Sequence, residues 1–168
     1  MAEAGVPLAG TTTYGYDAED RLTSVVTGGT TTATYAYDGD GDRVGKTVGG
    51  TTTPSTWDRT GLGGLGAVIG DGSGENVFGP TGLQERVAGG AAQYAQGDGL
   101  GSVRLVTDAA GSPVGTATYD AWGAPQAGSA TLGGFGFAGE QADAETGFVY
   151  LRARTYDPAT GQFLQRPL

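Results

Sequence analysis

The chain has 168 residues, no cysteine and no histidine, and a formal net charge of −9. The missing residue types exclude a disulfide framework, a thiolate nucleophile, a Cys/His zinc site and a triad with a histidine base. The net negative charge does not indicate a basic surface for binding nucleic acid. No apolar run approaches the roughly 20 residues that cross a bilayer. We therefore expect no nucleic-acid partner and no membrane insertion.

Glycine is the outlier of the composition, with 34 residues, or about 20% against a usual share near 7%. Leu, Ile, Val and Phe are scarce, and by composition alone such a chain would favour disorder. The remaining residues are periodic, however. Thr, Tyr, Val and Trp suit a pleated, half-buried surface, whereas Gly and Asp suit the turns between strands.

The first ten residues, MAEAGVPLAG, have neither the basic start nor the apolar centre of a signal peptide.

Two segments near the start of the chain repeat one pattern. Residues 13–32 read TYGYDAEDRLTSVVTGGTTT, and residues 34–53 read TYAYDGDGDRVGKTVGGTTT. Each unit has an alternating strand, an acidic or Gly-rich turn and a second strand, which predicts a β-hairpin. The recurring aromatic–Asp pairs along the chain are Tyr16-Asp17, Tyr37-Asp38, Trp57-Asp58, Tyr119-Asp120 and Tyr156-Asp157. We therefore predict an all-β chain of antiparallel hairpin repeats stacked on one another.

The second turn also has the residue types of an ion site. Asp38, Asp40 and Asp42 could surround calcium, but an EF-hand loop needs Gly where Arg43 stands and Glu where Gly49 stands. Turn chemistry is the favoured interpretation, with calcium as the alternative. A phosphate loop ending in Gly45-Lys46-Thr47 is excluded, because Asp40 takes the place of its first glycine.

A dinucleotide fingerprint can be read in GLGGLG, where Gly61, Gly63 and Gly66 have the spacing G-x-G-x-x-G. The fingerprint requires a hydrophobic strand before it and a helix after it. Here the polar segment TPSTWDRT precedes it, and another turn follows within a few residues. We expect no cofactor at this position.

Acidic residues cluster once more, at Glu140, Asp143 and Glu145. A dyad of the glycosidase or aspartic type can be imagined from them, but a solvated acidic loop before a strand is favoured. Arg152 and Arg154 alternate with apolar residues, so we expect them on one strand face, paired with those carboxylates rather than with a ligand. No catalytic, cofactor-binding or metal-binding residue is predicted.

The C-terminal half resembles a known family. It contains GDGLGSVRLVTDAAGSPVGTATYDAWGAP, followed by FAGEQADAETGFVYLRARTYDPATGQFL. These runs resemble the Rhs repeat-associated core, and the Tyr–Asp pairs resemble the YD repeats of Rhs and teneurin-type proteins. The resemblance is strong over residues 97–164 and weaker over residues 61–96. The positions that carry the repeat signature are Tyr16, Asp17, Tyr37, Asp38, Trp57, Asp58, Tyr119, Asp120, Gly139, Glu140, Thr146, Gly147, Tyr150, Arg152, Arg154, Tyr156, Asp157, Pro158, Gly161 and Phe163.

This resemblance implies hairpins wound into a curved or spiralling single-layer sheet, shell-like or barrel-like, around a wet cavity. In such proteins the shell encloses a polypeptide, often a toxin, and some members release it by aspartyl self-cleavage beyond the core. The sequence departs from that pattern, because Arg166 stands where an aspartate is expected before Pro167. Asp157-Pro158 matches a structural Asp–Pro step of the core. The resemblance thus implies a structural, non-enzymatic module, secreted or on a cell surface.

Three segments are expected along the chain: YD-type hairpins over residues 1–60, a Gly-rich repeat-like part over 61–96, and the Rhs-core-like part over 97–168, all in one structural unit. Partners would be other YD repeats of a parent protein, copies of the chain, or an enclosed polypeptide.

The alternative function is an extracellular binding module that recognises carbohydrate or a surface protein. Aromatics such as Trp57, Tyr119 and Trp122 on one sheet face would favour it. Unpaired end strands are expected at residues 11–16 and 148–156, and would promote self-association.

We predict that calcium leaves the stability of the chain unchanged, because the loop of Asp38, Asp40 and Asp42 lacks the bidentate Glu that the ion requires. The measurement is a thermal melt with and without millimolar calcium. A clear rise of the melting temperature in calcium would restore the metal-site interpretation.

Overall fold

The computed structural model describes residues 10–60, 65–128 and 130–165 of the chain. These residues are almost wholly β, in antiparallel strands, and the helical element among them is the short 3-10 turn η2 (Phe137–Gly139). None of the described helical residues forms a helix long and apolar enough to cross a membrane. The all-β prediction is confirmed. Gly61 and Gly63 of the apparent dinucleotide fingerprint lie outside the described residues.

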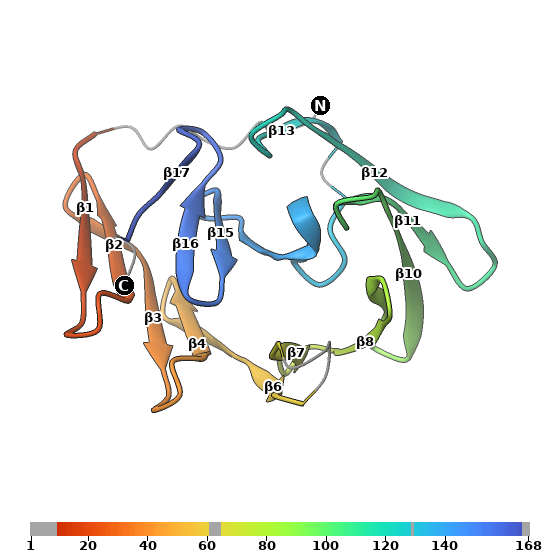
Figure 1. Ribbon diagram of the computed structural model, residues 1–168, viewed down its shortest axis with the longest axis horizontal. Helices are drawn as coiled ribbons and strands as arrows, with labels where there is room; N and C mark the ends of the chain where they lie inside the picture. Colours follow the sequence, from red (N-terminus) through yellow and green to blue (C-terminus); the bar gives the residue numbers. More distant parts are fainter. Residues whose placement is uncertain (1–9, 61–64, 129, 166–168) are drawn as a thin grey trace.

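The first sheet has five strands that follow one another in chain order (Figure 1). They are β1 (Thr12–Tyr16), β2 (Leu22–Thr27), β3 (Thr30–Tyr37), β4 (Arg43–Val48) and β5 (Thr51–Pro54). The Asp38–Asp42 stretch joins β3 to β4, so the opening repeats are hairpins as predicted. No closed barrel is formed by the described strands, because β1 and β5 are ends of this sheet.

The second sheet has eight strands, again in chain order. They are β6 (Thr56–Asp58), β7 (Ala67–Gly70), β8 (Glu75–Gly79), β9 (Gly82–Ala88), β10 (Ala91–Gly97), β11 (Val103–Asp108), β12 (Pro113–Tyr119) and β13 (Pro125–Gly128). Figure 1 shows that β1–β13 together form a curved layer, which we call the wall. The division of the chain at residues 60 and 96 stays a prediction.

The curvature of the wall has a local cause beside the Asp turns. In five hairpins the register shifts by one residue immediately before the turn, next to Tyr16, Tyr37, Gly97, Thr107 and Tyr119. Such a β-bulge bends its strand and increases the right-handed twist. Repeating it along the chain turns a ribbon of hairpins into a curved wall.

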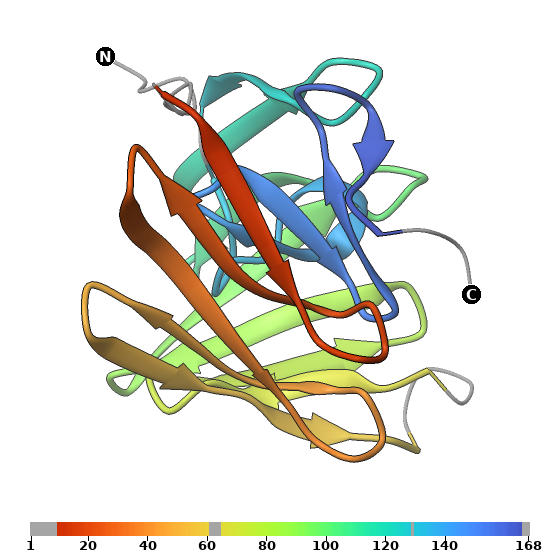
Figure 2. The ribbon, with the colours of Figure 1, turned by 90° about the vertical axis from the view of Figure 1, so that its left-hand side faces the viewer.

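The last part of the chain, residues 130–165, folds back on the concave side of the wall, and we call it the inner segment (Figures 1 and 2). It contains η2 and a four-stranded sheet of β14 (Gln141–Asp143), β15 (Phe148–Leu151), β16 (Arg154–Asp157) and β17 (Gln162–Phe163). The concave side is therefore occupied by the chain's own residues.

Two apolar clusters join the inner segment to the wall. At one end Phe148 of β15 packs with Leu22, Val25, Ala33 and Tyr35 of β2 and β3. At the other end Leu132 packs with Val103 and Val106 of β11. Each fully buried side chain of this size contributes roughly 1.5–3 kcal/mol. The concave face of the wall is therefore not polar throughout, because several of the few aliphatic side chains are buried against the inner segment.

Of the two predicted end strands, one lies at the end of a sheet and the other does not. β1 is an end of the first sheet, but β15 and β16 lie in the middle of the inner sheet, with β14 and β17 at its ends. The prediction of one exposed strand over residues 148–156 is therefore wrong. The reason is a tight turn after β15, where Arg152 has the left-handed φ of +58°. Arg152 and Arg154 consequently do not share a strand face.

Gly123 permits a close contact between the wall and the inner segment. Its φ is +93°, and a Cβ at this position would overlap the ring of Phe137. Gly111 holds the same place in the preceding Asp turn, with φ +78° and nothing within 4 Å of an added Cβ. The two glycines therefore share backbone strain but differ in packing.

We predict that Gly111→Ala lowers the free energy of unfolding by about 1–2 kcal/mol through left-handed strain alone. Gly123→Ala should cost about 1–3 kcal/mol more, because the added methyl displaces the Phe137 ring. Urea denaturation of both variants measures the difference. Equal losses would show that Phe137 does not pack into this turn.

Candidate functional site

The aspartates of the repeat signature close hairpin turns. In five turns the Asp Oδ1 accepts the backbone N–H groups of the residues two and four positions ahead, at 2.8–3.1 Å. These aspartates are Asp17, Asp38, Asp98, Asp108 and Asp120. Asp98 and Asp108 are outside the sequence signature because Gly97 and Thr107 precede them instead of an aromatic residue. A glycine three positions after the aspartate, as in the turns of Asp38 and Asp120, is the signal that could have found both.

Arginines neutralise several of these turns. Burial acts to raise the pKa of Asp98, but the hydrogen bond from Arg104 and those from the turn N–H groups outweigh it and hold the pKa below its ordinary value. In the predicted ion loop, Arg59 Nε lies 2.8 Å from Asp42 Oδ2, and its other nitrogens pair with Asp38 and Asp40. A guanidinium thus occupies the position where a cation would bind. Within the described part of the chain, no group of three or more acidic side chains is arranged to hold a metal ion.

The tyrosines of the signature tie separate parts of the fold together. Tyr37 Oη donates to the Leu22 carbonyl at 2.7 Å, within the first sheet. Tyr16 Oη donates to Leu164 O at 3.0 Å, and Tyr156 Oη donates to Trp122 O at 2.7 Å. The last two bonds join the wall to the inner segment.

The other predicted aromatics do not form a common sheet face. The Trp57 Nε1–H donates to the Arg43 carbonyl at 3.0 Å, and its ring meets Tyr150 edge-on at 6.3 Å. The Tyr119 ring packs beside Phe137, with centroids 5.6 Å apart. Trp122 is exposed, but it lies in the turn between β12 and β13.

The most deeply buried ion pair of the chain's described part joins β4 to the start of the inner sheet. Arg43, with its side chain 5% exposed, binds both oxygens of Asp143, 1% exposed, at 2.6 and 3.1 Å. Lys46 Nζ reaches Asp143 Oδ1 at 3.0 Å and also pairs with Glu145 at 3.1 Å. We call these four residues the clamp.

Two tyrosines enclose the clamp. The Arg43 guanidinium lies 4.2 Å from the ring centroid of Tyr150 and 5.2 Å from that of Tyr35. Tyr150 Oη accepts the backbone N–H of Arg43 at 3.0 Å. Burial raises the pKa of Tyr150 to about 12, so its hydroxyl stays neutral at physiological pH. The predicted solvated acidic loop is therefore wrong at Asp143, because β4 supplies two cations that the local sequence does not reveal.

A second ion pair anchors the turn after β15. Arg152 Nη1 bonds Glu140 Oε1 at 2.6 Å, and Arg152 Nε donates to the Gly66 carbonyl at 2.8 Å. Burial raises the pKa of Glu140, and Arg152 opposes that shift. The expected pairing of these arginines with the acidic cluster holds for Arg152, whereas Arg154 lies over the Phe163 ring at 3.5 Å.

Two turns of the inner sheet share the pattern Asp-x-x-Thr-Gly. In each, the N–H groups of the Thr and the Gly donate to the Asp carbonyl, as in Asp143–Gly147 and Asp157–Gly161. The carboxylate of Asp157 binds within its own turn, to the N–H of Ala159 and the hydroxyl of Thr160. The carboxylate of Asp143 is instead bound by the clamp cations. Similar turns therefore serve different purposes.

The remaining signature positions lie around these features. Gly139 closes η2 with φ +70° and lies against Gly101, and Thr146 is buried behind the clamp. Pro158 is buried in the last turn, and an added Cβ on Gly161 would lie 3.1 Å from the Trp122 ring.

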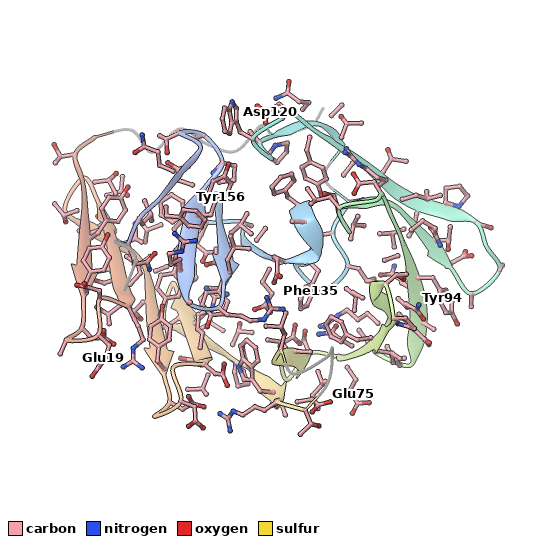
Figure 3. All side chains as sticks on the ribbon, viewed as in Figure 1. Glu19, Glu75, Tyr94, Asp120, Phe135 and Tyr156 are labelled. Carbon is pink, nitrogen blue, oxygen red and sulfur yellow. The ribbon has the colours of Figure 1, made fainter. Side chains whose placement is uncertain are left out.

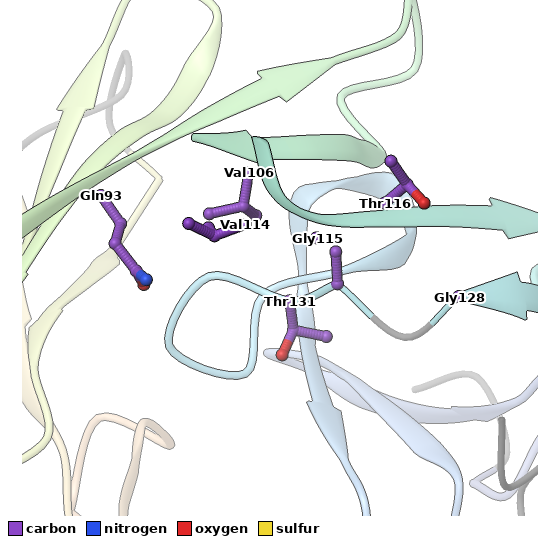
Figure 4. A pocket seen from close by; sticks show the side chains of 8 residues that line it. Gln93, Val106, Val114, Gly115, Thr116, Gly128 and Thr131 are labelled. Carbon is purple, nitrogen blue, oxygen red and sulfur yellow. The ribbon is translucent and has the colours of Figure 1, made fainter. Parts of the chain in front are cut away.

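Figure 4 shows a pocket of about 400 Å³ beside β11, β12 and the start of the inner segment. Its lining includes Gln93, Val106, Val114, Thr116 and Thr131, with three small residues completing it. None of its lining side chains is ionisable, so it offers no general acid, base or charged ligand. In Figure 3 the side chains that fill the concave side come from both the wall and the inner segment.

We predict that Asp143→Leu lowers the free energy of unfolding by about 3–5 kcal/mol, because it leaves a buried guanidinium without its partner. Arg43→Met with Asp143→Leu should cost less than the sum of the single changes. Arg21→Met, at the more exposed pair with Asp17, is the control and should have a small effect. Additive losses in urea denaturation would contradict a coupled clamp.

Comparisons with solved structures show the same fold. The chain aligns over 92% of its length with a protein in "Crystal Structure of TcdB2-TccC3-Cdc42", at a TM-score of 0.68 and 18% identity. It aligns over 94% of its length with a protein in the "Structure of Photorhabdus luminescens Tc holotoxin pore, Mutation TccC3-D651A", at a TM-score of 0.63 and 17% identity. In both cases the match covers 9% of the solved chain.

Sequence comparison finds the "tRNA(Glu)-specific nuclease WapA" of Bacillus subtilis subsp. natto (strain BEST195), 41% identical over 68 residues. The match covers 38% of this chain and 3% of that protein, so the chain corresponds to a small part of its curated relative. Residues 90–168 match the family model described as Teneurin YD-shell. This match confirms the resemblance to Rhs and YD-repeat proteins over residues 90–168.

Proposed function

We propose that the chain is a structural, non-enzymatic segment of an Rhs/YD-repeat shell, in which the wall encloses a polypeptide. The observation that carries this proposal is the position of residues 130–165 on the concave side, clamped through Arg43 and Asp143. A wall that holds a part of its own chain has the chemistry needed to hold polypeptide: apolar patches, paired cations and main-chain donors.

In this proposal the repeat signature has a building role. The aspartates set the turn and the bulge beside it, and the tyrosines fasten each hairpin to its neighbour or to the inner segment. Buried and half-buried charged side chains form ion pairs, such as Arg43 with Asp143 and Arg152 with Glu140. Because they are paired with each other, these four side chains fix geometry and are not free for proton transfer.

The nuclease named among the relatives does not favour an enzyme here. The matched 68 residues are 3% of that protein, and we propose that they correspond to shell rather than to its nuclease part. The binding-module alternative receives less support, because Trp57 and Tyr119 pack against the protein instead of forming an aromatic face. By the same family reasoning, we propose a secreted or cell-surface location.

The test is to nick the folded chain between the wall and the inner segment. A protease site introduced in place of Ser129 allows cleavage after folding, and gel filtration then measures whether residues 130–168 remain bound. We expect retention of the cleaved segment by the wall, and faster loss of it in the Asp143→Leu variant. Immediate dissociation of the segment in the otherwise unchanged chain would contradict the proposal.

The non-enzymatic part is tested separately with the intact chain. Incubation of the purified protein with a mixture of tRNAs, followed by denaturing electrophoresis, should show no cleavage. Cleavage that copurifies with the chain and disappears in a folded variant would make it an enzyme.

A further inference from the structure

Among the strands that the structure describes, none pairs with the outer edge of β1, and the main-chain groups on that edge point away from the sheet. Thr11 O accepts the N–H of Gly28 at 3.1 Å, and Thr12 lies opposite Thr27. Because antiparallel strands alternate their hydrogen-bonding direction, the N–H and C=O groups of Thr12 and Tyr14 face outward. β1 pairs with β2 on its other side. Outward groups of this kind are a template for another strand.

The other sheet ends among the described residues are blunted. β13 has four residues and begins with Pro125, which has no N–H to donate. β14 has three residues and β17 has two, which are too short to template a strand. β5 has four residues and ends in Pro54, and β6, the other end of the second sheet, has three residues. β1 differs from these end strands because it has five residues and contains neither a charged residue nor a proline.

The inner segment holds this edge in place. The Tyr14 ring lies 6.1 Å from the Phe148 ring, and Tyr16 is fixed by its hydrogen bond to Leu164. Both tyrosines nevertheless keep 38% and 40% of their surface exposed. A strand that is already ordered loses little further freedom when it binds.

We propose that β1 pairs with β1 of a second copy of the chain, antiparallel, around a two-fold axis at Tyr14. In this register Tyr14 lies opposite its own copy, and Thr12 of each chain lies opposite Tyr16 of the other. Aromatic and β-branched residues are favourable cross-strand pairs. Residues 11–16 carry no charge, so the contact itself meets no like-charge repulsion. The net charge of −9 on each copy opposes association at long range, and salt screens it.

The experiment compares Thr12→Pro with Thr12→Val. Proline removes one outward N–H and keeps every bond to β2, whereas valine keeps the N–H and a β-branched side chain. Sedimentation equilibrium should show a monomer–dimer equilibrium for the unchanged chain and for Thr12→Val. We expect the dimer dissociation constant of Thr12→Pro to be at least tenfold higher. Thermal melts confirm that both variants fold.

Amide hydrogen exchange places the interface independently of any variant. The exchange of Thr12 and Tyr14 should slow as the concentration rises, while that of Thr13, already bonded to β2, should not change. A monomer across a hundredfold concentration range would overturn the proposal, as would a dimer that leaves Thr12 and Tyr14 unaffected. Either result would leave the shell proposal standing, because retention of the nicked inner segment does not depend on β1 pairing.

Discussion

A buried arginine imposes the strongest constraint on this structure. Arg43 lies in β4, and its carboxylate partner Asp143 is 100 residues further along the chain. Neither charge is stable in the interior alone, since a buried charge without its partner costs several kcal/mol. The first sheet can therefore bury Arg43 only when the inner segment is in place. Because of this dependence, the first sheet and the inner segment form one structural unit although they are remote in sequence.

The unusual composition follows from where the other stabilising interactions lie in the fold. A curved wall of hairpins needs turns and bulges more than it needs aliphatics, and glycine and aspartate supply both. The few large apolar side chains are used where the inner segment meets the wall, around Phe148 at one end and Leu132 at the other. Between these clusters, ion pairs and tyrosine hydroxyls satisfy the buried polar groups.

Local features of the fold are predictable from the sequence, and its long-range features are not. Strand alternation and the Asp turns identify the hairpins correctly, because each hairpin is specified by adjacent residues. The inward folding of residues 130–165 has no local signal. Asp143 looks like a solvated loop residue until β4 brings Arg43 and Lys46 to it. Arg152 likewise continues an alternating pattern, and only its left-handed backbone shows that the strand ends there.

The candidate site shows the same division. The Tyr–Asp positions could be chosen from the sequence, but their partners lie across the fold, such as Leu164 for Tyr16 and Trp122 for Tyr156. Spacing along the chain does not specify which segments a curved sheet brings together.

Native-state amide hydrogen exchange tests most directly whether the wall and the inner segment are one cooperative unit. The amides of Val149 and Tyr150 in β15 should exchange as slowly as that of Val25 in β2, because all three would open only in global unfolding. Their exchange should also respond equally to low concentrations of urea. Fast, urea-independent exchange across β15, with β2 still protected, would show that the inner segment opens on its own and would contradict this account.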